Sequence, residues 1–251
     1  NHSDVFGRYS YKMQPTMLVY AVDKLFEALA PLIGFEDLHE RALRPGELLH
    51  SSVKERQAWA DHAESYLDEV RALVQTSLLK AWAAAWATRL GVEDQDVDRI
   101  KYGLIDPFFR AFAGWDLSRS LRTMCDFPTY EGDVHSFAER IARDAATKAP
   151  HAASVSDLAA WLETYRAKLT AEGRPTSHVA MHMKRANPRF VLRNWITDLV
   201  AEQLASSNDT KLLERVRAMC AAPFEAYDAP DDASLCEVGE LLQSNTPSCS
   251  S

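Results

Sequence analysis

Residues 52–91 read SVKERQAWADHAESYLDEVRALVQTSLLKAWAAAWATRLG, the longest stretch of helical periodicity in the chain. Ser52 and Glu55 have the spacing of a capping box, in which their side chains accept hydrogen bonds from backbone N–H groups of the first turn. Gly91 follows the last periodic residue, where glycine commonly ends a helix. We therefore predict one long amphipathic helix. Its inward side would contain Ala63, Leu67, Val70, Val74, Leu78 and Ala81, enlarged by Trp59, Trp82 and Trp86.

A shorter amphipathic helix is predicted upstream. It begins at Pro15, a residue suited to the first helical turn, and we expect Pro31 and Gly34 to end it. The apolar positions recur at helical spacing and are Leu18, Val22, Leu25, Phe26 and Leu29.

Downstream of Gly91, capping residues and prolines divide the chain into shorter helices. They are expected near residues 96–102, from Asp106, after Asp116, over 134–148 and 154–171, before Asn187, from Pro188, and over 210–219. Alternating runs rich in Val, Ile and Thr are scarce, so the fold class predicted is mainly α. The aromatic residues predicted to fill the core are Phe108, Phe109, Phe112 and Trp115.

Composition narrows the classes of partner. The chain has 251 residues, 47% of them hydrophobic, which suffices for a sizeable core. Its formal net charge of -8 disfavours binding to nucleic acid and to anionic membranes. The most apolar stretch, residues 78–87, includes Lys80 and is shorter than the roughly 20 residues that a membrane helix needs. We therefore expect neither nucleic acid nor a membrane as a partner.

Metal, disulfide and hydrolase motifs receive little support. Cys125, Cys220, Cys236 and Cys249 lie far apart, with no pair at metal-ligand spacing. His178 and His182 are four residues apart and would share a helical face, but a catalytic zinc usually needs three protein ligands. No Gly-x-Ser-x-Gly elbow is present. We predict no metal site in this chain and interpret both histidines as exposed or capping residues.

Three segments are expected along the chain. Residues 1–14 are polar and aromatic and resemble a loop, residues 15–226 carry the predicted helices, and residues 227–251 form an acidic linker and a mobile or docked tail containing Cys249. The first residue is Asn1 and not Met, so we expect processing or truncation to have removed the start.

Three ordered motifs resemble the selenoprotein O family. The first is Asn1-His2-Ser3-Asp4 followed by Gly7-Arg8-Tyr9 and Gln14-Pro15. The second is Met183 followed by Asn187-Pro188 and Leu192-Arg193-Asn194. The third is the terminal Ser248-Cys249-Ser250-Ser251. Each motif alone is weak, but their order and spacing together make the resemblance specific.

The resemblance implies a protein-kinase-like fold that binds ATP in an inverted pose and transfers AMP to Ser, Thr or Tyr hydroxyls of proteins. This chemistry implies ATP and Mg²⁺ as cofactors of the intact protein and protein substrates as partners. In the family, the catalytic residues precede the Asn-His-Ser-Asp motif, here Asn1 to Asp4. We therefore expect this chain to be the helical C-lobe and carboxyl-terminal region without the N-lobe, with no catalytic residue and no activity of its own.

The resemblance also nominates residues with other roles. Asn1, His2, Asp4, Arg8 and Tyr9 would belong to an activation-like segment, and the alternative is a hydrogen-bonded loop. Cys249 would be a redox-active thiol in the tail, and the alternative is an ordinary exposed cysteine.

Two other functions stay open at this point, namely a non-enzymatic helical interaction module and transfer of the γ-phosphate instead of AMP. The resemblance implies mitochondria for a eukaryotic source, which the stretch Tyr11 to Pro15 favours, and cytoplasm for a bacterial one.

Overall fold

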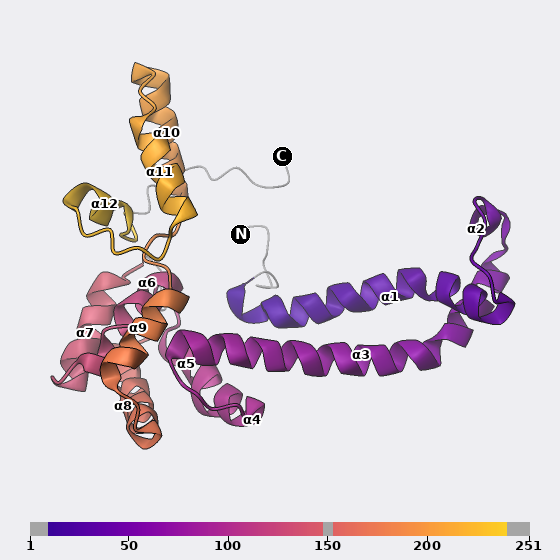
Figure 1. Ribbon diagram of the computed structural model, residues 1–251, viewed down its shortest axis with the longest axis horizontal. Coiled ribbons are helices and arrows are strands. Elements are labelled where there is room, and N and C mark those ends of the chain that lie inside the picture. The colour runs from indigo at the N-terminus through magenta and orange to yellow at the C-terminus, as the bar shows by residue number, and fades with distance from the viewer. Residues whose placement is uncertain (1–9, 148–152, 240–251) are drawn as a thin grey trace. The chain divides into compact units, whose positions relative to one another are not determined.

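The computed structural model describes residues 10–147 and 153–239, and in these ranges it contains helices and no β-strand (Figure 1). This confirms the prediction of a mainly α fold. The chain divides into two compact units, the first reaching Trp82 and the second beginning at Ala83. No helix in the described part is long and apolar enough to cross a membrane.

The first unit is built on two long helices. A short 3-10 turn, Tyr11–Met13, leads into α1 (Gln14–His39), and α2 (Glu47–His50) lies between α1 and α3 (Val53–Leu90). The predicted end of α1 at Pro31 and Gly34 is wrong, because the helix continues to His39. Gly34 is buried there and its missing Cβ lets α1 approach the backbone of Trp59 on α3, so packing overrides the local signal.

The prediction for α3 is confirmed in its bounds. Ser52 N–H donates to Glu55 Oε2 at 2.8 Å and Glu55 N–H donates to Ser52 Oγ at 3.2 Å, which completes the predicted capping box. The predicted inward side is only partly right: Ala63 and Leu67 are buried, Val74 and Leu78 are half-buried, and Val70 and Ala81 are exposed. A seven-residue pattern drifts around a straight α-helix, which turns part of a long stripe outward.

The second unit contains the carboxyl-terminal end of α3 and shorter helices. These are α4 (Val97–Ile100), a π-helical turn (Lys101–Ile105), α5 (Asp106–Ala111), α6 (Leu117–Met124), a 3-10 turn (Phe127–Thr129), α7 (Val134–Asp144), α8 (Val155–Glu172), α9 (Thr176–Ala186), α10 (Asn194–Ser207), α11 (Lys211–Ala221) and α12 (Pro230–Leu235).

Some of the predicted helix boundaries are confirmed, and these have capping side chains. Asp116 caps α6, and Ser154 with Asp157 forms a capping box at the start of α8, near the start predicted for the helix over 154–171. The helix predicted to reach Lys148 ends at Asp144 instead. The helix predicted from Pro188 is also wrong, because α10 begins only at Asn194. Pro188 lies in the irregular connection between α9 and α10, where Arg189 and Phe190 donate backbone hydrogen bonds to the carbonyl of Pro223.

Aromatic side chains fill the core of this unit. Phe108 stacks on Phe112 with ring centroids 4.1 Å apart, and Trp161 meets the edges of both. Phe108 and Trp86 are almost fully buried, whereas Phe109 and Trp115 are half-buried. The predicted aromatic core is therefore confirmed for Phe108 and Phe112 and is only partial for the other two residues.

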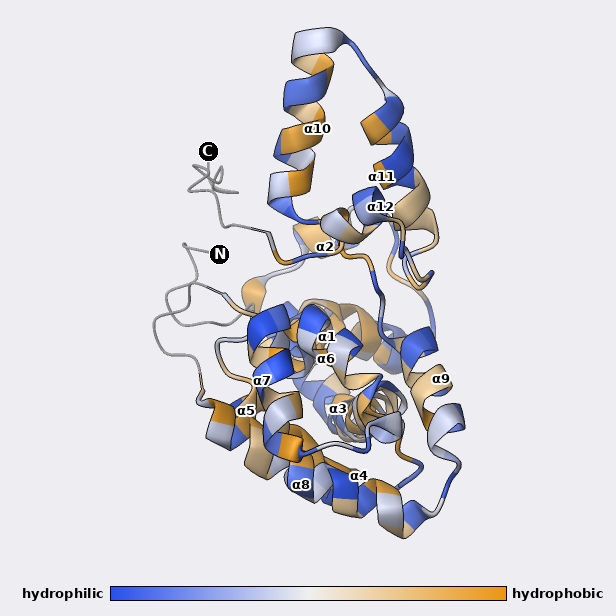
Figure 2. Ribbon diagram, turned by 90° about the vertical axis from the view of Figure 1, so that its left-hand side faces the viewer, coloured by the Kyte–Doolittle hydropathy of each residue, from blue (hydrophilic) through white to orange (hydrophobic). Residues whose placement is uncertain are grey.

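Helices α10 and α11 lie side by side, with α12 at one end of the pair (Figures 1 and 2). Leu235 and Cys236, at the end of α12, are buried in the same cluster as Phe190, Ile196 and Met219. The acidic segment after Pro223 is therefore docked as far as it is described, to Gly239.

Candidate functional site

The residues nominated by the first and third motifs lie outside the described part of the chain. These are Asn1, His2, Asp4, Arg8, Tyr9 and Cys249. Their predicted roles stay predictions. His178 and His182 are both exposed on α9.

The second motif contributes a buried amide that joins α9 to the end of α3. Asn187 is fully buried and follows the last residue of α9. Its Nδ2 donates to the carbonyls of Arg89 at 2.7 Å and Met183 at 3.1 Å, and its Oδ1 accepts from Arg89 Nε at 3.1 Å. The side chain thus supplies partners for carbonyl groups near two helix ends, which would otherwise be costly to bury.

Arg193 of the same motif joins α10 to α6. Its guanidinium donates two hydrogen bonds to the carboxylate of Asp116, at 2.7 and 2.9 Å, and both side chains are largely buried. Asp116 also accepts the Arg119 N–H as the cap of α6. A bidentate pair of this kind fixes the relative orientation of the two side chains and also contributes electrostatic attraction. The motif residues Asn187 and Arg193 therefore position helices.

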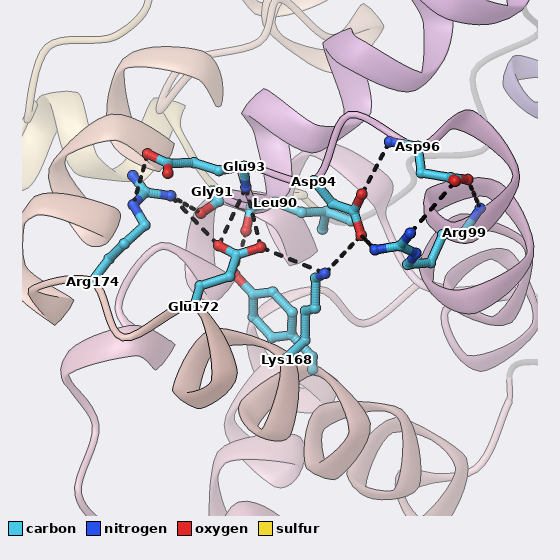
Figure 3. A network of polar contacts seen from close by, with 10 residues as sticks. Leu90, Gly91, Glu93, Asp94, Asp96, Arg99, Lys168, Glu172 and Arg174 are labelled. Carbon is cyan, nitrogen blue, oxygen red and sulfur yellow. Dashed lines mark hydrogen bonds and ion pairs between the residues drawn. The ribbon is translucent and has the colours of Figure 1, made fainter.

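A polar network surrounds the turn after α3 (Figure 3). Lys168 of α8 donates to Asp94 at 2.8 Å, and this hydrogen bond is the main cause of the lowered pKa of the Asp94 carboxyl. Glu172 accepts the Glu93 N–H, and Arg174 donates to the Gly91 carbonyl at 2.8 Å. Gly91 has φ +66°, and a Cβ there would crowd Met183 and Val179. The network holds the α3 terminus against α8 and α9.

A polar cavity of about 370 Å³ opens in the same unit. Helices α6, α7 and α9 and the segments at 189 and 226–228 line it. Lys184 and Arg140 both contact the Asp126 carboxylate, at 2.9 and 2.7 Å. The charged residues lining the cavity are Arg119, Arg122, Arg140, Lys184, Arg189, Asp126, Asp144 and Asp228.

One carboxylate of the cavity, that of Asp126, is held ionised by its neighbours. Burial alone would raise the pKa of Asp126, but hydrogen bonds from Lys184 and Arg140 outweigh it and lower the pKa. Thr123 donates to Asp144 at 3.4 Å. In the described residues no group of three His, Cys, Asp or Glu side chains is placed to hold a metal ion. The charged side chains that line this cavity are suited to binding a charged ligand.

Comparison with known proteins supplies the family. The family model described as "Protein adenylyltransferase SelO" matches residues 1–221. The chain belongs to this family. The SelO-family chain is 30% identical over 247 residues to the protein nucleotidyltransferase YdiU of Paraburkholderia xenovorans, 29% over 262 residues to that of Ralstonia nicotianae, and 31% over 253 residues to that of Burkholderia cenocepacia.

These alignments cover 95% of the chain but only 42–43% of each relative. The SelO-family chain thus spans less than half the length of these relatives. The family match confirms the resemblance to the selenoprotein O family that the three motifs indicated. The relatives are bacterial, so the preference for a mitochondrial protein gains no support from them.

The described cysteines of this SelO-family chain differ in exposure. Burial raises the pKa of the Cys125 thiol to about 11, and Cys125 donates to the Leu121 carbonyl at 3.3 Å. Burial likewise raises the pKa of Cys236. Both thiols are therefore suited to packing and poorly suited to thiolate chemistry, while Cys220 is exposed on α11.

Sequence reasoning missed the cavity. Arg119 and Arg122 are three residues apart and so share a face of α6, which was a usable signal. The remaining cations come from α7, α9 and the segment after α9, at separations that no local pattern connects. Of the three motifs that were noticed, the second pointed to positioning residues, and the residues nominated from the other two lie outside the described part.

Proposed function

We propose that the intact protein is an ATP-dependent, Mg²⁺-assisted protein adenylyltransferase that transfers AMP to Ser, Thr or Tyr hydroxyls of protein substrates. The observation that carries this proposal is the match of residues 1–221 to the adenylyltransferase family. The naming of the bacterial relatives as protein nucleotidyltransferases supports it.

We further propose that this chain is the helical C-lobe and carboxyl-terminal region of a kinase-like fold. The ATP-binding lobe would lie in sequence outside the 251 residues, which is in keeping with relatives more than twice as long. The positioning contacts of Asn187 and Arg193 suit a supporting role, since they brace helix ends. The chain alone would then bind ATP unproductively and transfer nothing.

Bound ATP would supply the transferable AMP group, and the metal would neutralise the triphosphate. The described residues contain no carboxylate cluster suited to Mg²⁺, so no step is assigned to them. Asn1, His2, Asp4, Arg8 and Tyr9 are proposed as an activation-like segment, and Cys249 as a redox-active thiol of the tail.

Labelled nucleotide tests the activity. A protein of the relatives' length would be incubated with Mg²⁺ and ATP labelled on either the α- or the γ-phosphate, with the 251-residue chain as the control. AMP transfer places the α-label on protein and leaves the γ-label in solution. Incorporation of the γ-label would establish phosphorylation instead, and a protein that carries neither label would refute the proposal.

A second candidate is a non-enzymatic helical interaction module. Several large apolar side chains of the first unit are exposed, including Leu18, Leu25, Leu73 and Leu79. If this were the function, the 251-residue chain would capture a partner without nucleotide, and charged substitutions at Leu73 and Leu79 would abolish capture. A chain that stays monomeric and captures no partner would exclude it.

Cytoplasmic localisation is proposed on the basis of the bacterial relatives. Fractionation of cells that express the tagged protein would test it.

A further inference from the structure

The polar cavity concentrates positive charge in a chain that is acidic overall. Five cationic side chains and three carboxylates line it, which leaves two positive charges in the lining, whereas the whole chain carries a formal charge of -8. Arginine is the most common of these cations, and its planar fork matches the oxygens of a phosphate group. The local sign of charge therefore favours an anion.

The cations are not all neutralised by the protein. Asp126 takes hydrogen bonds from Lys184 and Arg140, so those charges are balanced only in part. Arg122 donates Nη1 to the carbonyls of Lys184 and Asn187, and no described carboxylate lies within ion-pair distance of it. Arg119 Nε is buried without a hydrogen-bond partner among the described residues. Donors for an added anion are thus present.

One carboxylate of the docked tail competes for the same cations. Glu237 Oε1 lies 2.9 Å from Arg119 Nη2 and 3.9 Å from Arg189 Nη2, and both arginines line the cavity. Glu237 follows directly after Cys236, which is buried against α10 and α11. The tail therefore places a negative group beside the cavity.

We propose that this cavity binds a small phosphate-bearing ligand, and that Glu237 competes with it for Arg119 and Arg189. The volume of about 370 Å³ exceeds the needs of one inorganic phosphate and lies in the range of small-ligand sites. A ligand with two phosphoryl groups or a phosphoryl group on a small carrier suits it best. The proposal is independent of AMP transfer.

Titration calorimetry on the whole 251-residue chain tests the site, with pyrophosphate, inorganic phosphate and AMP as separate probes. Pyrophosphate is expected to bind most tightly, because it offers the most charge to the five cations. Tighter binding of AMP would identify a phosphoryl group on a carrier as the preferred ligand. Absence of saturable binding of all three probes would overturn the proposal.

Adjacent residues of α9 provide a matched pair of variants. Lys184 lines the cavity, whereas Arg185 is exposed and does not line it. K184Q is expected to weaken pyrophosphate binding about five- to ten-fold, the loss of one charge-assisted hydrogen bond. R185Q, with the same change of charge, is expected to stay within about two-fold. Equal losses in both variants would show binding by overall charge and would refute a built site.

Glu237→Gln tests the competition. The amide keeps the shape of the side chain but removes the negative charge, so pyrophosphate is expected to bind about three- to ten-fold more tightly. Circular dichroism would establish that each variant keeps its helix content. Unchanged or weaker binding by E237Q in a folded chain would refute the competing role of the tail.

Discussion

The two units of this chain bury very different amounts of apolar side chain. In the second unit, interlocked aromatic rings around Phe108 and Trp161 are enclosed on all sides. In the first unit, the buried cluster consists of Ala30, Ala63 and Leu67 with a few half-buried neighbours. Two long helices share only one seam, so most of each surface faces away from it. A pair of helices therefore leaves much apolar surface exposed, which a set of short crossing helices does not.

This difference also separates two kinds of stabilisation. The first unit depends on a close backbone approach at Gly34 and on polar pairs such as Asp37 with His62, at 2.6 Å. The second depends on core volume and buried hydrogen bonds, such as the one from Tyr165 to the Leu90 carbonyl at 2.5 Å. Substitutions in the two units should therefore change the free energy of unfolding by different amounts.

Truncation of a core ring is expected to have the largest effect. Phe108→Ala removes a fully buried ring and should lower the free energy of unfolding by about 3–5 kcal/mol. Leu73→Ala on α3, where the side chain is 65% exposed, should change it by less than about 0.5 kcal/mol. Urea unfolding followed by circular dichroism would measure both. Equal losses would mean that the exposed face of the first unit contributes as much as the core.

The sequence predicted the parts of this fold that depend on local chemistry. The caps at Ser52, Asp116 and Ser154 and the stop at Gly91 each involve residues within one turn, and all were found as expected. Pro31 failed as a stop signal because the approach of α3 at Gly34 outweighs a single missing hydrogen bond.

The candidate site was less predictable, for the same reason. Asn187 was noticed in a motif, but its partner Arg89 lies 98 residues earlier, so its role needed the fold. The cavity assembles cations from several helices, and only the pair on α6 has a local spacing. The residues nominated from the first and third motifs, Asn1 to Tyr9 and Cys249, lie outside the described part and their roles stay untested.

A Cβ at Gly34 should break the seam of the first unit. In Gly34→Ala the added carbon would overlap the carbonyl oxygen of Trp59, so α1 and α3 must separate, at a cost of about 3 kcal/mol. Gly103→Ala meets no atom within 4 Å and should be neutral or stabilising by up to about 1 kcal/mol. Hydrogen exchange should accelerate in α1 and the facing part of α3 only in the Gly34 variant. Unchanged exchange there would contradict the close approach.

Loss of the Asn187 amide should be felt only in the second unit. Asn187→Ala leaves the Arg89 carbonyl without its amide donor in a buried place, and we expect a loss of about 2 kcal/mol. Asn194→Ala is a suitable control because that side chain is exposed at the start of α10. Faster exchange should appear at the ends of α3 and α9. If Asn194→Ala lost as much stability as Asn187→Ala, the loss would come from helix propensity and not from the hydrogen bonds of the Asn187 amide.

The smallest expected effects concern how stability depends on pH, and they again differ between the two units. Hydrogen bonds from Arg41 lower the pKa of Glu47 in the first unit to about 2, and Lys168 lowers the pKa of Asp94 in the second. A lowered pKa stabilises the fold fully above the ordinary value, here 4.5 for Glu47 and 3.8 for Asp94, and this stabilisation is lost as the pH falls through the folded value. Glu47 and Arg41 are substantially exposed, so Glu47→Gln should barely change the melting temperature at neutral pH. The side chain of Asp94 is 7% exposed, so Asp94→Asn should lower the melting temperature measurably at neutral pH. In strong acid the melting temperatures of Asp94→Asn and the unsubstituted chain should become equal, because Asp94 is then protonated. Thermal melts between about pH 2 and about pH 7 would compare the two variants, and a larger loss for Glu47→Gln would reverse the assignment of buried polar stabilisation to the second unit.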